Sequence, residues 1–172
     1  MVCSNSPLAA SVGIDVMKKG GNAFDAALAV AAAETVTIIP SCGVGGDSFV
    51  LLYEAATGKV TGVNSSGPAP TGATGQYYRS QGYTTMPLTG PHSISVPGEV
   101  AAWETIHQTF CTMPFSQLLA PAENYAREGF PLPPGIAKSL ANGAGKLSQF
   151  PSSASALLPN GLPLVEGDVL GN

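Results

Sequence analysis

The chain has 172 residues, of which 44% are hydrophobic and only 10% are charged, and its formal net charge is −4. The negative charge and the scattered basic residues argue against nucleic-acid binding, because no basic stripe could follow a phosphate backbone. The most apolar stretch, residues 26–33, is shorter than the roughly 20 residues that cross a bilayer, so no membrane span is expected. Because so few residues are charged, we instead expect another polypeptide to cover much of the surface.

The cysteine and histidine content gives no sign of a metal or cofactor site. Cys3, Cys42 and Cys111 are odd in number and match no zinc spacing, which predicts reduced thiols. With two histidines and no clustered carboxylates, neither a metal nor another cofactor is expected. The chain opens without a basic and apolar signal segment, which favours the cytoplasm over the periplasm or secretion.

The first helical pattern begins close to the amino end. Residues 1–4 fit a short strand, and Ser6 followed by Pro7 is typical of an N-cap and first helical residue, so a helix is predicted to about Lys19.

A second helix is predicted from Ala23 to about Val36, after a glycine pair. Asn22 can cap it and Asp25 can answer in a capping box. Its many alanines allow close packing on both sides, so this helix is expected to be buried.

A glycine-rich loop, residues 40–47, leads into a strand over 49–54 and a second strand over 59–64, joined at Thr57-Gly58. This pattern predicts an antiparallel hairpin. Residues 1–64 are therefore expected to form a helix pair with a hairpin.

Three further segments follow. Residues 65–97 are rich in Gly, Pro, Ser and Thr and predict an extended, wrapping loop. Residues 98–150 are predicted to be helical, with helices near 98–110, 115–128 and 134–147. Residues 151–172 are expected to form a loop tail that approaches another helix, so the polypeptide is expected to continue.

These residues allow several chemical interpretations. Gly43–Gly46 resembles a nucleotide-binding loop, but a helix precedes it and a strand follows, the reverse of the required order. Cys3 with His92 or His107 could suggest thiol catalysis, yet no local signature supports it. Asp25 and Glu34 fall roughly on opposite faces of their helix, so Asp25 is better interpreted as a helix-start residue. The residues alone thus predict an α+β fragment that needs a partner.

Longer motifs resemble the start of the γ-glutamyltransferase family, in the family's order and over nearly the whole chain. They are Met1–Ser4 with Leu8-Ala9, Lys18–Ala27, Pro40 with Gly43–Phe49, Val96-Pro97-Gly98, Met113–Ala122 and Ala126–Phe130.

The resemblance implies an N-terminal-nucleophile hydrolase fold, an αββα sandwich only partly contained in this chain. Members are made as zymogens that cut themselves into a large and a small chain, which pair as a heterodimer. The threonine that heads the small chain is the nucleophile, and its own amine is the base, with a pKa of about 7.7–8.0. This chain resembles the first part of the large chain, so no catalytic residue is expected in it and, alone, it should be inactive.

The resemblance also bears on the substrate, an amide or γ-glutamyl compound such as those of glutathione metabolism. Glutamyl transferases carry an Arg-x-x-Ala-Pro pattern whose arginine binds the substrate's α-carboxylate. Alignment on Ala69-Pro70 places Ser66 at that position, and acylase-like relatives have arginine where this chain has Pro68. We therefore expect a different acyl group, with Asn64, Ser65, Ser66 and the Gly43–Asp47 loop near the pocket, unless the serines are ordinary turn residues.

Two other functions stay open. A decayed homologue kept as a non-catalytic scaffold or binding protein would share these motifs. An unrelated α+β binding domain would require every motif match to be accidental.

Overall fold

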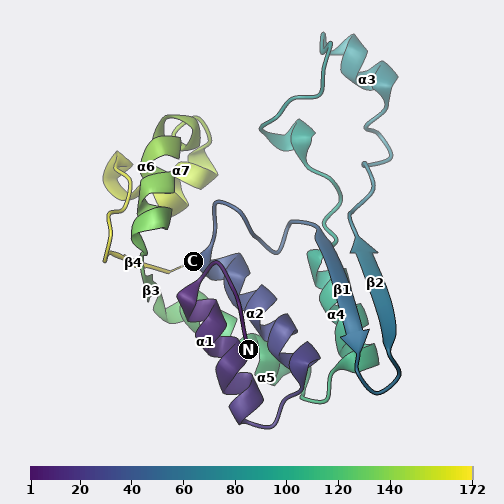
Figure 1. Ribbon diagram of the computed structural model, residues 1–172. Coiled ribbons are helices and arrows are strands. Elements are labelled where there is room, and N and C mark those ends of the chain that lie inside the picture. The colour runs from purple at the N-terminus through teal and green to yellow at the C-terminus, as the bar shows by residue number, and fades with distance from the viewer. Residues whose placement is uncertain (172) are drawn as a thin grey trace. The chain divides into compact units, whose positions relative to one another are not determined.

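The computed structural model describes residues 1–171, which form two units (Figure 1). The first unit joins residues 1–43 to the chain from Thr109 onward, and the second comprises residues 44–108. The split explains how segments far apart in the sequence share one core.

In the first unit, α1 (Pro7–Lys18) and α2 (Ala23–Thr37) form the predicted helix pair. The Ser6 hydroxyl accepts a hydrogen bond from the amide of Ala9, 3.3 Å away, as an N-cap does. Residues 1–4 form no strand in the described structure, so that prediction was wrong. Instead, the Ser4 hydroxyl donates to the Glu34 carboxylate on α2 at 2.5 Å.

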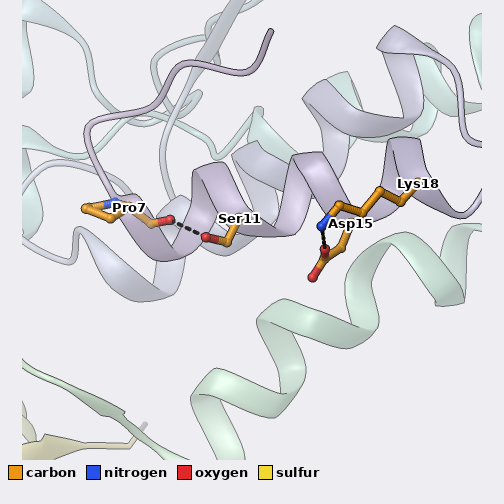
Figure 2. A network of polar contacts seen from close by, with 4 residues as sticks. All are labelled: Pro7, Ser11, Asp15 and Lys18. Carbon is orange, nitrogen blue, oxygen red and sulfur yellow. Dashed lines mark hydrogen bonds and ion pairs between the residues drawn. The ribbon is translucent and has the colours of Figure 1, made fainter.

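Local interactions line the solvent face of α1 (Figure 2). The Ser11 hydroxyl donates to the carbonyl of Pro7 at 3.0 Å, and Lys18 pairs with Asp15 at 3.2 Å. Both side chains of the ion pair are largely exposed, so the pair contributes little stability, on the order of 0.5 kcal/mol.

The core of this unit lies where α2 packs against α1 and against α5 (Phe115–Glu128). The predicted burial of α2 is confirmed, since its small and aliphatic side chains are enclosed on several faces. Its buried hydrophobic residues are Ala26, Leu28, Ala29, Val30, Ala32 and Ala33. Small side chains allow the three helices to approach closely. This close approach gives the high packing density that is usual in protein interiors.

The carboxyl-terminal part of the first unit has its own apolar cluster. Strand β3 (Phe130–Pro131) pairs antiparallel with β4 (Val169–Leu170), and α6 (Pro134–Leu147) lies where a helix was predicted. The cluster comprises Phe130, Leu132, Ala137, Leu140 and Leu170.

The tail is more regular than predicted. Helix α7 (Pro151–Leu157) and the 3₁₀ turn η2 (Pro159–Gly161) replace the expected loop. Pro151 at the first helical position starts α7 in spite of the Ser-rich composition, because its missing N–H and fixed φ suit that position. Asn172 lies outside the described residues.

The second unit contains the predicted hairpin of β1 (Ser48–Glu54) and β2 (Lys59–Ser65), with Ser48 opposite Ser65 (Figure 1). Residues 65–97 are not wholly extended, since α3 (Gly75–Ser80) and the 3₁₀ turn η1 (Pro91–Ser93) interrupt them. The Thr74 hydroxyl caps α3 by accepting from the Tyr77 amide at 3.1 Å. Helix α4 (Glu99–Phe110) follows as predicted.

None of the helices within residues 1–171 has both the length and the apolar composition needed to cross a membrane.

Candidate functional site

Asp47 lies at the end of the glycine-rich loop and connects three segments of the second unit. Its carboxylate accepts hydrogen bonds from the Ser66 hydroxyl at 3.2 Å and the Gly67 amide at 3.0 Å. The Ser95 hydroxyl donates to both carboxylate oxygens, at 3.2 and 3.3 Å. We call Asp47, Ser66, Gly67 and Ser95 the Asp47 cluster.

The register of the hairpin brings Asp47 and Ser66 together. Because Ser48 pairs with Ser65, the residues just before β1 and just after β2 emerge side by side at the open end of the ladder. Short polar side chains at these positions are close enough to form a hydrogen bond. The sequence places these residues 19 positions apart, and the turn at the other end of the hairpin aligns them.

The other two predicted site residues stabilise this end of the hairpin. The Ser65 hydroxyl donates to the Gly98 carbonyl at 2.7 Å. The Asn64 side-chain oxygen accepts a hydrogen bond from the Ser66 amide at 3.0 Å, and this bond forms an Asx-type turn. Of the three, only Ser66 belongs to the Asp47 cluster.

Two glycines allow the backbone of residues 65–67 to approach residues 96–98. A Cβ atom on Gly67 would overlap the carbonyl of Val96, and one on Gly98 would overlap the carbonyl of Ser65. The Val96 amide donates to the Pro68 carbonyl at 3.0 Å, which completes the contact. The Val-Pro-Gly motif therefore serves this close approach.

The glycine-rich loop contributes a carbonyl to this region. The amides of Gly98 and Glu99, at the start of α4, both donate to the Gly46 carbonyl at 3.0 Å. These amides lie at the start of a helix and have no acceptor within it, so the Gly46 carbonyl supplies one. The loop thus anchors α4 beside the Asp47 cluster.

The cluster carries a negative charge. The Gly67 amide, above all, lowers the pKa of the Asp47 carboxyl, desolvation opposes this, and the Ser66 and Ser95 hydroxyls lower it further. Among the described residues, the ion pairs are Lys18–Asp15 and Arg127–Glu123, so no described basic side chain neutralises Asp47. At neutral pH this carboxylate is ionised.

The other candidates have different surroundings. The His92 ring contacts tyrosines, and Glu34 accepts a hydrogen bond from Ser4. Asp25 completes the predicted capping box with Asn22, which is confirmed. All three cysteines are thiols. Within residues 1–171, no group of three or more His, Cys, Asp or Glu side chains is arranged to hold a metal ion.

Sequence reasoning expected the Gly43–Asp47 loop near the pocket but did not single out Ser95. Ser95 is 48 residues from Asp47 and lies in a stretch without periodicity. The signal available was the adjacent Val96-Pro97-Gly98 motif, which marks a segment held close to other backbone.

The fold is of the α+β type, and a polar cluster lies at the open end of its hairpin. The γ-glutamyltranspeptidase family model matches residues 9–172. The chain is 36% identical over 174 residues to a glutathione hydrolase proenzyme of Bacillus subtilis, covering 99% of this chain and 30% of that protein.

Solved structures agree. The γ-glutamyltranspeptidase of Helicobacter pylori matches with a TM-score of 0.94 and 28% identity, over 100% of this chain and 50% of that one. A cephalosporin acylase of Bacillus halodurans matches with a TM-score of 0.91 and 34% identity, over 97% and 32%.

The chain therefore belongs to the γ-glutamyltranspeptidase family, and it carries part of the N-terminal-nucleophile hydrolase fold predicted for it. It spans about a third of the length of the curated relative.

Proposed function

We propose that this chain is the leading part of the large chain of a self-processing amide hydrolase or acyl transferase whose acyl group is not γ-glutamyl. The relative is named a proenzyme, and this chain covers 30% of its length. The nucleophilic threonine would head the small chain that the rest of the precursor supplies. Without that threonine, this chain would bind the substrate but would not cleave its amide bond.

The relationship between Asp47 and Ser66 carries the proposal on substrate. In the alignment on Ala69-Pro70, the family resemblance puts Ser66 in the place of the arginine that binds an α-carboxylate. The Ser66 hydroxyl donates to Asp47. The ionised carboxylate of Asp47, beside Ser66, repels a substrate carboxylate, whereas an arginine would attract it. An acyl group that is neutral or carries an amine fits this charge better than a γ-glutamyl group.

The roles of this chain follow from that charge. Ser66 and Ser95 would orient the acyl group with their hydroxyl oxygens, while Asp47 holds both side chains in place. The threonine's amine, with a pKa of about 7.7–8.0, would take the hydroxyl proton as that oxygen attacks the amide carbonyl. The proton would then pass to the leaving amine.

The exposed face of the hairpin supports a partner from the same precursor. Phe49 is 71% exposed and Leu51 81% exposed, whereas Leu52 on the opposite face is 4% exposed. Large apolar side chains gathered on one sheet face mark a surface that another layer covers. The remaining part of the precursor is the partner we propose.

Mass spectrometry of the protein expressed from its full-length gene, with N-terminal sequencing of each chain, tests the processing. Two chains, the smaller beginning with threonine, are expected. A single uncleaved chain would overturn the proposal and favour a scaffold or binding homologue. Assays with γ-glutamyl and uncharged acyl p-nitroanilides test the substrate, and efficient turnover of the γ-glutamyl compound would contradict the proposed specificity.

A further inference from the structure

Three tyrosines surround His92 in the segment between Gly67 and Ser95 of the Asp47 cluster. The ring centroids of Tyr78 and Tyr83 both lie 5.7 Å from that of His92, and the Tyr77 centroid lies 5.9 Å away. The Tyr78 hydroxyl donates to the His92 carbonyl at 3.2 Å. Because this bond satisfies the hydroxyl, Tyr78 is held in place and presents its ring.

A cavity of about 360 Å³ lies beside these rings. Its lining is mainly apolar and includes Ala69, Pro70, Ala73, Tyr78, Met86 and Ile94. Met86 and Ile94 are 56% and 58% exposed, so apolar surface in the cavity faces solvent. The volume lies within the range of roughly 300–1,000 Å³ that small-molecule sites occupy.

Ser95 links this cavity to the polar site, because it lines the cavity and its hydroxyl donates to Asp47. Ala69 and Pro70, also in the lining, follow Ser66 and Gly67 almost directly in the chain. An apolar hollow with polar groups converging at one side is typical of a site for a ligand with a ring and a polar end.

We propose that this cavity binds an aromatic ring carried by the acyl group of the substrate. Tyr78 and His92 offer ring surfaces, against which a third ring gains more than its buried area alone provides. The amide end of the acyl group would then lie toward Ser95 and the Asp47 cluster. This inference rests on the proposed function and narrows its substrate class.

The test uses the full-length protein and two p-nitroanilides that differ only by a ring, 3-phenylpropionyl and propionyl. The wild type is expected to favour the phenylpropionyl compound by at least about tenfold in kcat/KM. Ala73→Leu, which fills the cavity, should abolish this preference. Ala56→Leu, in the hairpin turn and outside the lining, is the matched control and should keep the preference.

Met86→Ala is a second variant, which enlarges the cavity and should shift the preference toward a naphthyl ring. Equal kcat/KM values for the two wild-type substrates would overturn the inference. A preference that survives Ala73→Leu would also overturn the inference. If that variant loses thermal stability as well, the cavity is filled by protein.

A binding measurement separates this inference from the proposed function. Saturation-transfer NMR should detect the uncharged 3-phenylpropionamide on the wild type and on Ala56→Leu, but at least about tenfold less on Ala73→Leu. If no anilide is turned over, the proposed function fails, and this binding difference alone decides the inference. Equal saturation in the three proteins would overturn the aromatic site even if anilides are cleaved.

Discussion

The hydroxyl of Thr112 donates a hydrogen bond to the carboxylate of Asp25 at 2.7 Å, across 87 residues of chain. The amides of Thr112 and Met113 donate to the same carboxylate at 2.9 and 3.0 Å, and the amide of Asn22 donates at 2.8 Å. Asp25 is fully buried, so this capping residue also holds the segment that leads into α5.

Replacing Asp25 by Asn should destabilise the protein by roughly 2–4 kcal/mol, because buried amides lose a charged acceptor. Asp15→Asn on the exposed face of α1 is the matched control, with an expected effect within about 0.5 kcal/mol. Denaturant unfolding of the full-length protein measures both, and equal effects would contradict a structural role for Asp25.

The same carboxylate should make stability depend on pH. Desolvation, the largest influence, raises the pKa of Asp25, but the hydrogen bonds from Thr112, Met113 and Asn22 together outweigh it and hold the pKa below its ordinary value of 3.8. Its contribution is therefore present above that value and lost as the pH falls through the lowered pKa. The Asp25→Asn variant should lose less stability than the wild type between pH 5 and roughly pH 2, as thermal unfolding would show.

Cys111 should resist alkylation. Burial, the charge of Asp25 and a hydrogen bond to its carboxylate raise the pKa of the Cys111 thiol to about 12. Its thiolate fraction at pH 8 is then roughly 1 in 10,000, and the thiolate is the reactive form. Timed iodoacetamide labelling followed by peptide mass spectrometry should find Cys3 and Cys42, which are exposed, modified before Cys111. Equal labelling rates at Cys3 and Cys111 would contradict this.

Gly98 should not tolerate a methyl group. Ala at this position would place a Cβ against the carbonyl of Ser65 and push β2 away from the start of α4, at a cost of about 1–3 kcal/mol. Gly72→Ala is the control, because nothing lies within 4 Å of its added Cβ. Thermal unfolding of the two variants should separate them, and an unchanged Gly98→Ala protein would refute the close approach.

An arginine at position 66 should restore recognition of a γ-glutamyl group. Ser66→Arg supplies the guanidinium, and Asp47→Asn in the double variant stops that arginine from pairing with Asp47. The double variant is expected to gain about 30-fold or more in kcat/KM for γ-glutamyl p-nitroanilide over the wild type, equivalent to about 2 kcal/mol. The Asp47→Asn single variant is the control, and a gain of the same size there would show that removing charge suffices.

The sequence by itself determined the elements whose causes are local. Asn22 and Asp25 stand three residues apart, which is the spacing a capping box needs, and the structure has that box. The Thr57-Gly58 turn and its flanking strands similarly predicted the hairpin. Within 65–97, the short helix α3 escaped prediction because a single cap at Thr74 is a weak signal in a Gly- and Pro-rich stretch.

Tertiary structure alone decided which polar groups meet. Nothing local shows that Ser95 reaches Asp47, 48 residues away, or that Thr112 reaches Asp25. Ser65 and Ser66 are adjacent, yet one bonds Gly98 and the other Asp47, because Ser65 is the last residue of β2 whereas Ser66 lies in the turn that follows it. Spacing along the chain specifies turns and caps, whereas long-range hydrogen bonds depend on how the packed elements close the loops between them.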